Sequence, residues 1–432
     1  MTIFNLPESD VLGLLAGVRG MSDDTGIDPA EAFARAAWTC IAEPGDGVAG
    51  LVVNTLGAAA ALRLVLTTAQ PERWEAALME QGEAADPEGE ALRVESIAGG
   101  IERWRPRLNS VDVVRAFGQA RRVSAQLVVP GDALWPVQVA DLGQHAPIAL
   151  WWRGIPDALR ALDNSIALVG ARASSGYGEH VAMEAASGLV DRGYAIVSGA
   201  AYGIDGMAHR SALASRGLTV AFLAGGLDRF YPRGHDDLLT KIAQSGCIVS
   251  ELPCGQEPTK WRFLQRNRLI AASSNATVVI EAGWRSGSLN TASHAAEMGR
   301  PLGAVPGPVT SPSSAGCHRL LREYDAVCVT NAAEMAALVD DDGGSGDGQA
   351  GAGTNVADRS GEYTSDETRL IDALSTRSPR YSIDVARRSG LSVTTVTSTL
   401  AFLELAGAVA ERENGWVLAP KARKGDARAR QK

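Results

Sequence analysis

The segment SIALVGARASSGYG, residues 165–178, joins an apolar run to a turn of small and polar residues. The run Ile166–Gly170 lacks polar alternation, which is typical of a strand buried on both faces of a parallel sheet. Similar runs recur, with room for a helix between most of them. They are Ala195–Gly199, Thr219–Ala224, Cys247–Ser250, Thr277–Glu281 and Leu302–Val305. Strands and helices in this order form right-handed βαβ units. Residues 126–339 are therefore predicted to be a doubly wound α/β domain, with a lead-in segment ahead of residue 165.

Differences in composition divide the rest of the chain into a helical region, a linker, a small domain and a tail. Residues 1–125 are rich in Ala, Leu and Glu at helical spacing and predict a mainly helical N-terminal region. Residues 340–362 are polar and Gly-rich, as in a flexible linker. Residues 363–419 are a small compact unit, and residues 420–432 are a basic tail. The most apolar stretch, 47–68, is interrupted by Asn54 and Arg63, which favours a buried helix over a membrane span.

Charge is unevenly distributed along the chain, whose net charge is −9. Residues 1–100 carry 5 basic and 16 acidic side chains, whereas residues 165–330 carry 15 basic and 13 acidic ones. The central region therefore does not share the acidity of the N-terminal region. The 5 cysteines show no CxxC or Cys/His spacing, and no metal site is expected. No leader pattern opens the chain, so a cytoplasmic protein with reduced thiols is expected.

Ligands of an open parallel sheet bind at the carboxyl ends of the strands. At the first of these ends, Gly170, Arg172 and Ser174 follow a strand and open a helix. Small residues let backbone amides approach an anion, the helix N-terminus favours negative charge, and Arg172 adds a cation. No GK[ST] motif occurs, which argues against a P-loop ATPase.

The second loop contains Ser198, Gly199 and Gly203, followed by a helix with Asp205 and His209. The spacing of four residues places the carboxylate and the imidazole on one helix face. In one interpretation, Asp205 orients His209 beside the ligand. In the other, Asp205 caps the helix and His209 packs inside the fold. Both roles would support the site.

A third segment, KWRFLQRNR, combines cations and aromatic rings. Cations that neutralise phosphates, interleaved with rings that stack on bases, are typical of single-strand binding surfaces. The predicted DNA-binding residues of this segment are Lys260, Arg262, Phe263, Arg266, Asn267 and Arg268.

The fourth loop follows Glu281, and its residues Ser286, Gly287 and Ser288 open another helix. Small and hydroxyl residues at this position can bind an anion. We call the turn at 170–174 the first cradle and the turn at 286–288 the second cradle. Glu281 is expected to accept hydrogen bonds from the amides of Ser286–Ser288 and so to hold this cradle in shape. Two cradles and a cationic aromatic segment at one sheet edge predict a polyanionic ligand longer than one phosphate.

The central region resembles the DprA/Smf family through an ordered set of motifs. They are GAR at 170–172, SGxAxGIDxxAH at 198–209, GGLDxxYP at 225–232, SELP at 250–253, RNRLIA at 266–271, EAxxxSGSLxTA at 281–292, and VPG at 305–307 with GC at 316–317. The resemblance implies an extended Rossmann fold that binds single-stranded DNA, forms a homodimer and helps to load a RecA-type recombinase in transformation or other recombination. The chain departs from the family at Leu264-Gln265, His235 and Asn290, where Pro, Asn and Ile are common.

The C-terminal unit has the pattern of a winged helix. TSDETRLIDALS, SIDVARRSG and SVTTVTSTLAFLELAG predict three helices, and AVAERENGWVLAP predicts a hairpin around Asn414-Gly415. The helix that starts at Ser392–Thr399 could read DNA, but only Arg387 and Arg388 lie nearby in sequence. Contact with DNA and contact with a protein therefore both remain open for this domain.

Two other functions compete with DNA binding. The central domain also resembles LOG-type nucleotide phosphoribohydrolases, but His294 stands where their catalytic carboxylate would fall, with Glu281 as a substitute. A winged-helix transcription regulator with a small-molecule-sensing Rossmann domain is the third possibility. The favoured prediction is a DNA-binding protein without catalytic residues, cofactor or metal and without a membrane partner.

Overall fold

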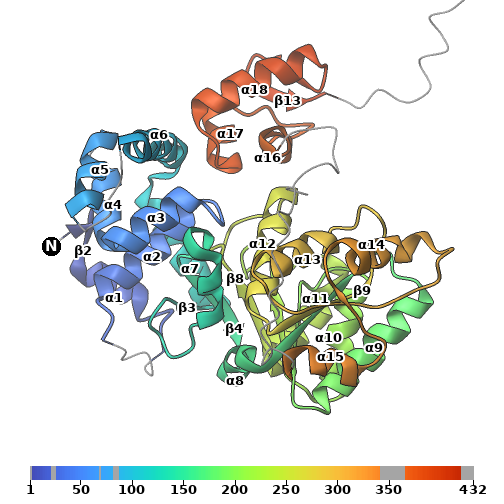
Figure 1. Cartoon of the computed structure of the whole chain (residues 1–432). Coiled ribbons are helices and arrows are strands. Elements are labelled where there is room, and N and C mark those ends of the chain that lie inside the picture. The colour runs from blue at the N-terminus through green and yellow to red at the C-terminus, as the bar shows by residue number, and fades with distance from the viewer. Residues whose placement is uncertain (1, 21–25, 68–69, 81–86, 341–364, 420–432) are drawn as a thin grey trace, which may run out of the picture. The chain divides into compact units, whose positions relative to one another are not determined.

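The computed structural model describes residues 2–20, 26–67, 70–80, 87–340 and 365–419. The chain divides into two compact units, one made of residues 1–66 and 109–360 and the other of residues 67–108 and 361–432 (Figure 1). The N-terminal region is thus shared between the units: residues 1–66 and 109–125 belong with the sheet, and residues 67–108 belong with the C-terminal domain.

A largely parallel sheet of nine strands forms the centre of the first unit, in the order β11-β10-β9-β5-β6-β7-β8-β4-β3. The strands are β3 (Gln126–Val128), β4 (Leu150–Gly154), β5 (Ser165–Gly170), β6 (Ala195–Ser198), β7 (Thr219–Phe222), β8 (Cys247–Ser250), β9 (Ala276–Glu281), β10 (Leu302–Ala304) and β11 (Val327–Cys328). The six predicted strands and the doubly wound class are confirmed. The lead-in segment adds β3 and β4, which pair antiparallel at one edge and were not predicted.

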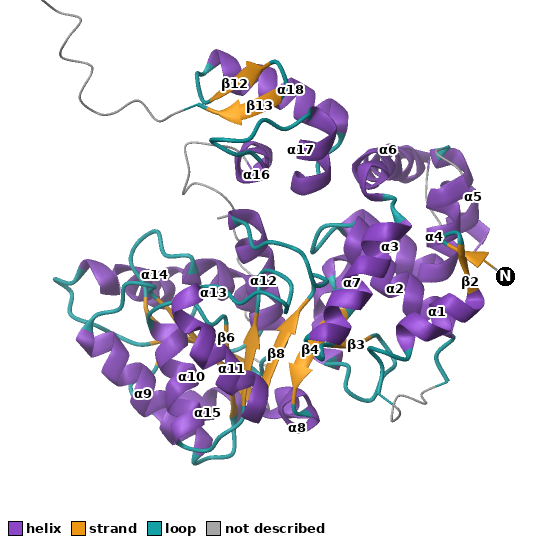
Figure 2. Cartoon of the chain, turned by 180° about the vertical axis from the view of Figure 1, so that it is seen from behind, coloured by secondary structure: helices purple, strands orange, loops and turns teal. Residues whose placement is uncertain are grey.

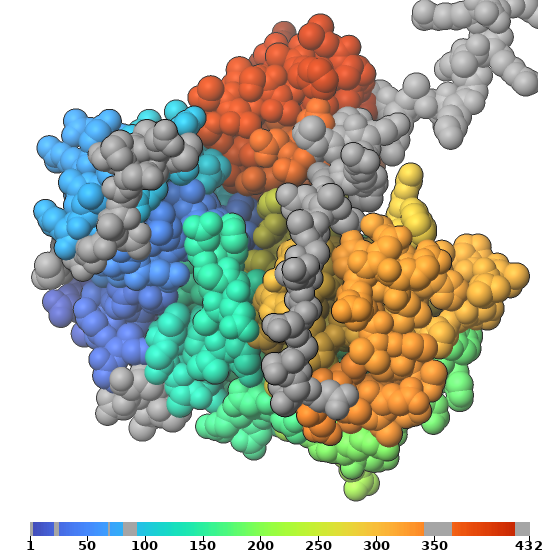
Figure 3. All heavy atoms as spheres, viewed as in Figure 1, coloured from blue at the N-terminus to red at the C-terminus, as the bar shows by residue number. Residues whose placement is uncertain are grey.

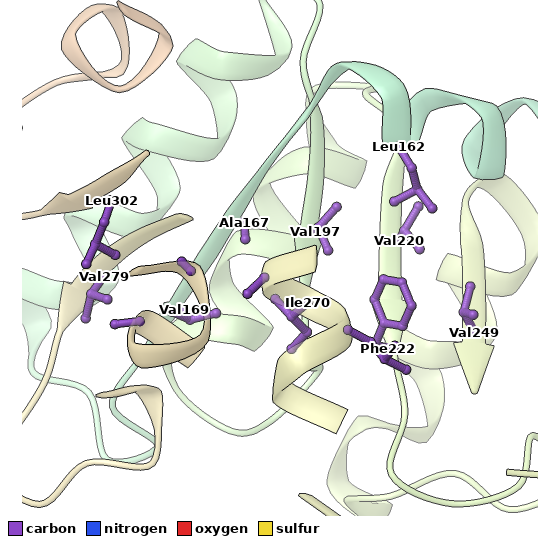
Figure 4. Packing of buried hydrophobic residues seen from close by; sticks show 14 of the residues in the cluster. Leu162, Ala167, Val169, Val197, Val220, Phe222, Val249, Ile270, Val279 and Leu302 are labelled. Carbon is purple, nitrogen blue, oxygen red and sulfur yellow. The ribbon is translucent and has the colours of Figure 1, made fainter. Parts of the chain in front are cut away.

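Helices cover both faces of the sheet, as Figure 2 shows. Ile270, Ala292 and Leu320 pack on one face with strand residues such as Val169 and Val197 (Figure 4). Leu189, Ala212 and Met335 pack on the other face. Because adjacent strand residues point to opposite faces and both faces are dry, the strands read as unbroken apolar runs. The helices of this domain are α8 (Pro156–Arg160), α9 (Gly176–Val190), α10 (Ile204–Ala214), α11 (Asp236–Ser245), α12 (Lys260–Ala272), α13 (Ser288–Glu297), α14 (Ala315–Glu323) and α15 (Ala332–Asp340), with short 3₁₀ turns at η3 (Ala161–Asn164), η4 (Arg233–His235) and η5 (Pro312–Ser314).

The N-terminal helices of the same unit lie beside the lead-in segment, where blue residues adjoin teal ones in Figure 3. They are α1 (Glu8–Leu15), α2 (Pro29–Ile41), α3 (Gly47–Leu56), α4 (Ala58–Thr67) and α7 (Ser110–Arg122), preceded by the two-residue strands β1 (Thr2–Ile3) and β2 (Leu6–Pro7). α3 approaches η2 (Val137–His145) closely, because an added Cβ at Gly50 would lie 1.8 Å from the Gln144 carbonyl oxygen.

The single buried helix predicted over residues 47–68 is wrong in one respect. The segment forms two helices, α3 and α4, which are bent by 113°. Gly57, with φ of 81°, ends α3, and the Glu31 carboxylate then accepts hydrogen bonds from the amides of Ala58 and Ala59 at the start of α4. This pair together has the length and composition of a span, but no single helix in the described ranges does.

The second unit contains the predicted winged helix. It is built from α16 (Ser365–Ala373), α17 (Ser382–Ser389), α18 (Val393–Leu405) and the hairpin of β12 (Val409–Arg412) and β13 (Gly415–Leu418). The hairpin turn lies at Glu413-Asn414, one residue before the predicted position, because Arg412 pairs with Gly415. From the N-terminal region the unit takes α5 (Pro71–Glu80), α6 (Pro87–Trp104) and η1 (Arg105–Arg107). The predicted basic tail and the predicted linker, except for its first residue Asp340, lie outside the described residues.

Gly50→Ala should destabilise the first unit, since the new methyl group must displace the backbone of Gln144. We expect the free energy of unfolding to fall by about 1–3 kcal/mol, the usual cost of overpacking. Gly118→Ala is the matched control: it also lies within a helix, α7, but nothing stands within 4 Å of an added Cβ. The control should gain about 1 kcal/mol from helix propensity. Equal stability of the two variants in urea titrations would contradict the close approach.

Candidate nucleic-acid interface

The sheet has a topological switch point between β5 and β9. β6 continues the sheet from one side of β5, and β9 continues it from the other. The turns after β5 and β9 therefore flank a crevice at the carboxyl ends of the strands, where open α/β sheets bind ligands. The first and fourth predicted loops are these two turns.

Glu281 ties the two turns together. Its carboxylate accepts hydrogen bonds from the Ser175 hydroxyl at 2.6 Å and the Ser175 amide at 2.8 Å, and the residue is 2 % exposed. The prediction that Glu281 binds the amides of Ser286–Ser288 is wrong, because its side chain points from the end of β9 toward the neighbouring β5 turn. Glu281 thus shapes the first cradle, not the second.

The first cradle offers one exposed cation. Arg172 is exposed, and its guanidinium lies 5.2 Å from the centroid of the Phe263 ring. Gly170 ends β5 in close contact with Ile204, to which an added Cβ would come within 2.6 Å. The Ser174 hydroxyl donates to Glu179 at 2.9 Å, while Ser175 caps α9.

The polar side chains of the second loop support the site from inside the fold. The Ser198 hydroxyl is fully buried and donates to the Leu168 carbonyl at 2.6 Å, which leaves no route to a ligand. Gly203 has φ of 76°, and an added Cβ would lie 2.2 Å from the Ala171 carbonyl oxygen. The loop after β6 is thereby packed directly against the loop after β5.

Asp205 and His209 bind different partners, which favours the structural interpretation of the pair, although Asp205 does not cap α10 as that interpretation predicted. Asp205 accepts hydrogen bonds from the amides of Gly199 at 3.2 Å and Ala201 at 3.4 Å. Burial raises the pKa of Asp205, while Arg266 opposes that shift. His209 Nδ1 lies 2.7 Å from the Thr219 hydroxyl, and burial lowers the His209 pKa to about 3, so the imidazole is neutral at pH 7.

Arg266 lies beneath the site. Its guanidinium is buried and donates to the carbonyls of Gly199 at 2.5 Å and Phe222 at 2.6 Å, at the ends of β6 and β7. Burial lowers the Arg266 pKa to about 10, with Asp205 acting in the opposite direction, so the group stays charged at neutral pH. An added Cβ at Gly199 would lie 2.3 Å from this guanidinium, which explains the glycine.

The flanking arginines of α12 are also buried. Arg262 forms a bidentate ion pair with Glu43 at 2.7 and 3.1 Å, and Arg268 pairs with Glu251 at 2.8 Å. The expectation that both arginines bind phosphate does not fit this geometry, since their side chains are 4 % exposed and face carboxylates. Lys260, at the first position of α12, is exposed.

The second cradle is attached to α12 through Asn267. Its side-chain amide donates to the Gly287 carbonyl at 3.3 Å and to Asn290 at 3.2 Å. The hydroxyls of Ser286 and Ser288 lie 2.8 Å apart, and Gly287 between them is exposed. Asn290, a departure from the family pattern, thus serves as a partner of Asn267.

Sequence reasoning missed Tyr231, the second aromatic ring of the site. Its ring lies 5.3 Å from Phe263 and is 49 % exposed. Both rings border a small recess, lined by Gly199, Leu223, Ala224, Gly225, Arg229, Tyr231, Pro258, Phe263 and Arg266. The signal was the YP pair that closes GGLDxxYP, since an aromatic residue shortly after a strand end lies at the ligand-binding edge.

The fold and the crevice define a Rossmann-like protein whose switch point presents a cation, two aromatic rings and two helix-opening turns. Residues 126–340 match the model of the family described as DNA recombination-mediator protein A, and residues 357–415 match the DprA winged helix domain. The chain belongs to the DprA/Smf family of DNA-processing proteins.

The chain is similar to one curated relative and to two solved structures. The chain is 43% identical over 307 residues to a putative DNA processing protein DprA of Mycobacterium tuberculosis, covering 68% of this chain and 77% of the relative. DprA of Streptococcus pneumoniae, a solved structure, is 29% identical with a TM-score of 0.49 and covers 64% of this chain and 94% of its own. DNA processing protein A from Helicobacter pylori, solved in a study of its single-stranded DNA binding mode, is 29% identical with a TM-score of 0.45, covering 50% and 96%.

Arg262→Leu should act on stability and leave DNA affinity per folded molecule unchanged. Removing one partner of a buried ion pair leaves the other charge buried without compensation, which lowers the free energy of unfolding by about 3–5 kcal/mol. The double variant Glu43→Leu/Arg262→Leu should recover much of that loss, because no charge then stays buried alone. Unfolding in urea gives the stabilities, and oligo(dT) titrations over salt give the affinities. Arg172→Ala is the control that should leave stability unchanged. An Arg262→Leu protein that is as stable as the parent, but whose DNA affinity depends less on salt, would show that Arg262 contacts DNA and does not support the fold.

Proposed function

We propose that this protein binds single-stranded DNA across the crevice between the β5 and β9 turns and presents it to a RecA-type recombinase. The observation that carries the proposal is the stack of the exposed Arg172 over Phe263, beside the Tyr231 ring. A guanidinium can neutralise a phosphate while aromatic rings accept bases, and every base has a π-face. This combination suits a strand whose sequence varies.

The predicted site residues divide into contacts and supports. The proposed contacts are Gly170, Arg172, Ser174, Gly199, Gly203, Lys260, Phe263, Ser286, Gly287 and Ser288, with Tyr231 added. The proposed supports are Ser198, Asp205, His209, Arg262, Arg266, Asn267, Arg268 and Glu281, whose polar groups are engaged inside the protein. Few cations then face the strand, so base stacking supplies a large share of the affinity.

Recombinase loading, a homodimer and a cytoplasmic location belong to the same proposal. The family description supports recombinase loading, because a mediator of DNA recombination handles single strands that a recombinase must coat. The balance of charge in residues 165–330, 15 basic against 13 acidic, also lets the central domain approach DNA despite the acidic N-terminal region.

The nucleotide hydrolase is the weaker candidate. His294 lies 3.3 Å from Glu297, and burial lowers the His294 pKa while Glu297 opposes the shift. Glu281, at the end of β9, has both oxygens bonded to Ser175. Neither group is free to stabilise an oxocarbenium ion or move a proton.

The transcription regulator is also weaker. α18 would be its reading helix, yet VTTVTSTLAFLEL, residues 393–405, contains no Lys or Arg. Of the two nearby arginines, Arg387 donates to the Pro106 carbonyl within the second unit. Hydroxyl groups are thus the polar side chains that the start of this helix offers to a phosphate, without a positive charge to strengthen the contact.

Arg172→Ala and Lys260→Ala should each weaken binding of oligo(dT), since each removes one cation from the strand path. Loss of one phosphate contact lowers the slope of log affinity against log salt by about 0.7. Arg160→Ala is the matched control, because Arg160 is exposed on α8, ahead of β5 and away from the carboxyl ends. Unchanged slopes for both site variants, measured by fluorescence anisotropy, would remove these cations from the interface.

The purified protein should not hydrolyse ATP, nucleoside monophosphates or DNA, because the carboxylates of the crevice are committed to the fold. Chromatography of nucleotide products and gels of labelled DNA would check this expectation. Glu281→Gln should still weaken DNA binding by loosening the Ser175 turn. Turnover that disappears in Glu281→Gln and survives in Arg172→Ala would favour the hydrolase.

A further inference from the structure

Trp284 has no role in the site described so far, yet it lies in the loop that forms the second cradle. It is 54 % exposed. The other eight tryptophans of the chain are buried or half-buried. A large exposed ring in a loop at the ligand-binding edge of the sheet is a candidate contact for a ligand.

The ring is held in place from beneath by α14. The Arg319 guanidinium lies 5.4 Å from the Trp284 centroid and is itself fixed by Glu323 at 2.7 Å. The Gly316 amide donates to the Ala282 carbonyl at 2.7 Å, which anchors the start of the loop. A cation stacked on an indole and held by a carboxylate keeps the ring in one orientation at little entropic cost.

The loop also connects to the proposed strand path. Gly287, three residues after Trp284, accepts a hydrogen bond from Asn267 on α12, one turn after Phe263. Three residues span at most about 11 Å, so the Trp284 backbone lies within that distance of a residue bonded to the helix that carries Phe263. Single-strand sites commonly extend over several nucleotides and stack bases on successive aromatic side chains.

We propose that Trp284 is a second stacking position, where a base of the same single strand packs on the indole after the strand leaves the Phe263 recess. This inference rests on the proposed DNA-binding function and extends it. Two exposed cations, Arg285 beside it in sequence and Arg322 on α14, supply charge for the intervening phosphates.

The test measures affinity against strand length. Oligo(dT) of 4, 8, 12, 16 and 20 nucleotides would be titrated against the full chain and its Trp284→Ala, Trp284→Tyr and Phe402→Ala variants. Phe402 is the matched control, since it is an aromatic residue exposed by 61 % on α18. One lost stack is worth about 1–3 kcal/mol. Trp284→Ala should therefore bind long oligonucleotides at least fivefold more weakly and the shortest one equally well. Trp284→Tyr should restore most of the loss, and Phe402→Ala should match the parent.

The outcomes separate this proposal from the broader one. No binding by the unsubstituted chain would overturn both. Intact binding with equal affinities for the parent and Trp284→Ala at every length would overturn the second stacking position alone. A change of oligomeric state in Trp284→Ala by sedimentation, with affinity following the assembly, would assign the ring to contact between copies of the chain and also overturn it. Photocrosslinking of bromodeoxyuridine in a 20-nucleotide strand to Trp284, mapped by mass spectrometry, is the supporting direct result.

Discussion

The buried Arg266 guanidinium is the interaction on which the binding edge depends. A charge inside a protein is tolerated only where hydrogen bonds and an opposite charge replace water. Arg266 meets this condition with the Gly199 and Phe222 carbonyls and the nearby Asp205. In doing so it joins the ends of β6 and β7 to α12. Phe263 on the same helix is thereby held at the recess, so the aromatic contact depends on a cation that the ligand does not need to touch.

The other two arginines of α12 also form buried ion pairs, and one of these pairs links the helix to the N-terminal region. Arg262 reaches Glu43, 219 residues away in sequence, and Arg268 reaches Glu251. The helical region is therefore part of the unit that carries the site, and it contributes a carboxylate to the position of α12. The proposed interface then consists of the exposed Arg172 and Lys260 and the rings of Phe263 and Tyr231. Such a surface favours flexible strands whose bases can turn outward.

In the winged helix, arginine side chains bind backbone carbonyls of the same unit. In the second unit, Arg107 donates to the carbonyls of Arg387 and Arg388 at the end of α17, and Arg387 donates to the Pro106 carbonyl. These bonds stabilise the negative end of a helix dipole with a cation. Arg387, one of the two basic residues that suggested DNA contact, is thus engaged with residues 105–107. The basic residues that could support DNA contact by this domain are thus partly committed to the second unit itself.

The sequence by itself determined the doubly wound sheet, the edge at which ligands bind, the winged helix and the family, because strand periodicity, turn glycines and ordered motifs are local properties. The partners of the charged residues were decided by tertiary structure alone. Spacing predicted four equivalent cations in KWRFLQRNR, but the packing of α12 on the sheet buried three of them and left Lys260 exposed. Glu281 likewise joined Ser175 and not its own loop. Hydrogen-bond partners depend on which strands become neighbours, and neighbours such as β5 and β9 are more than a hundred residues apart.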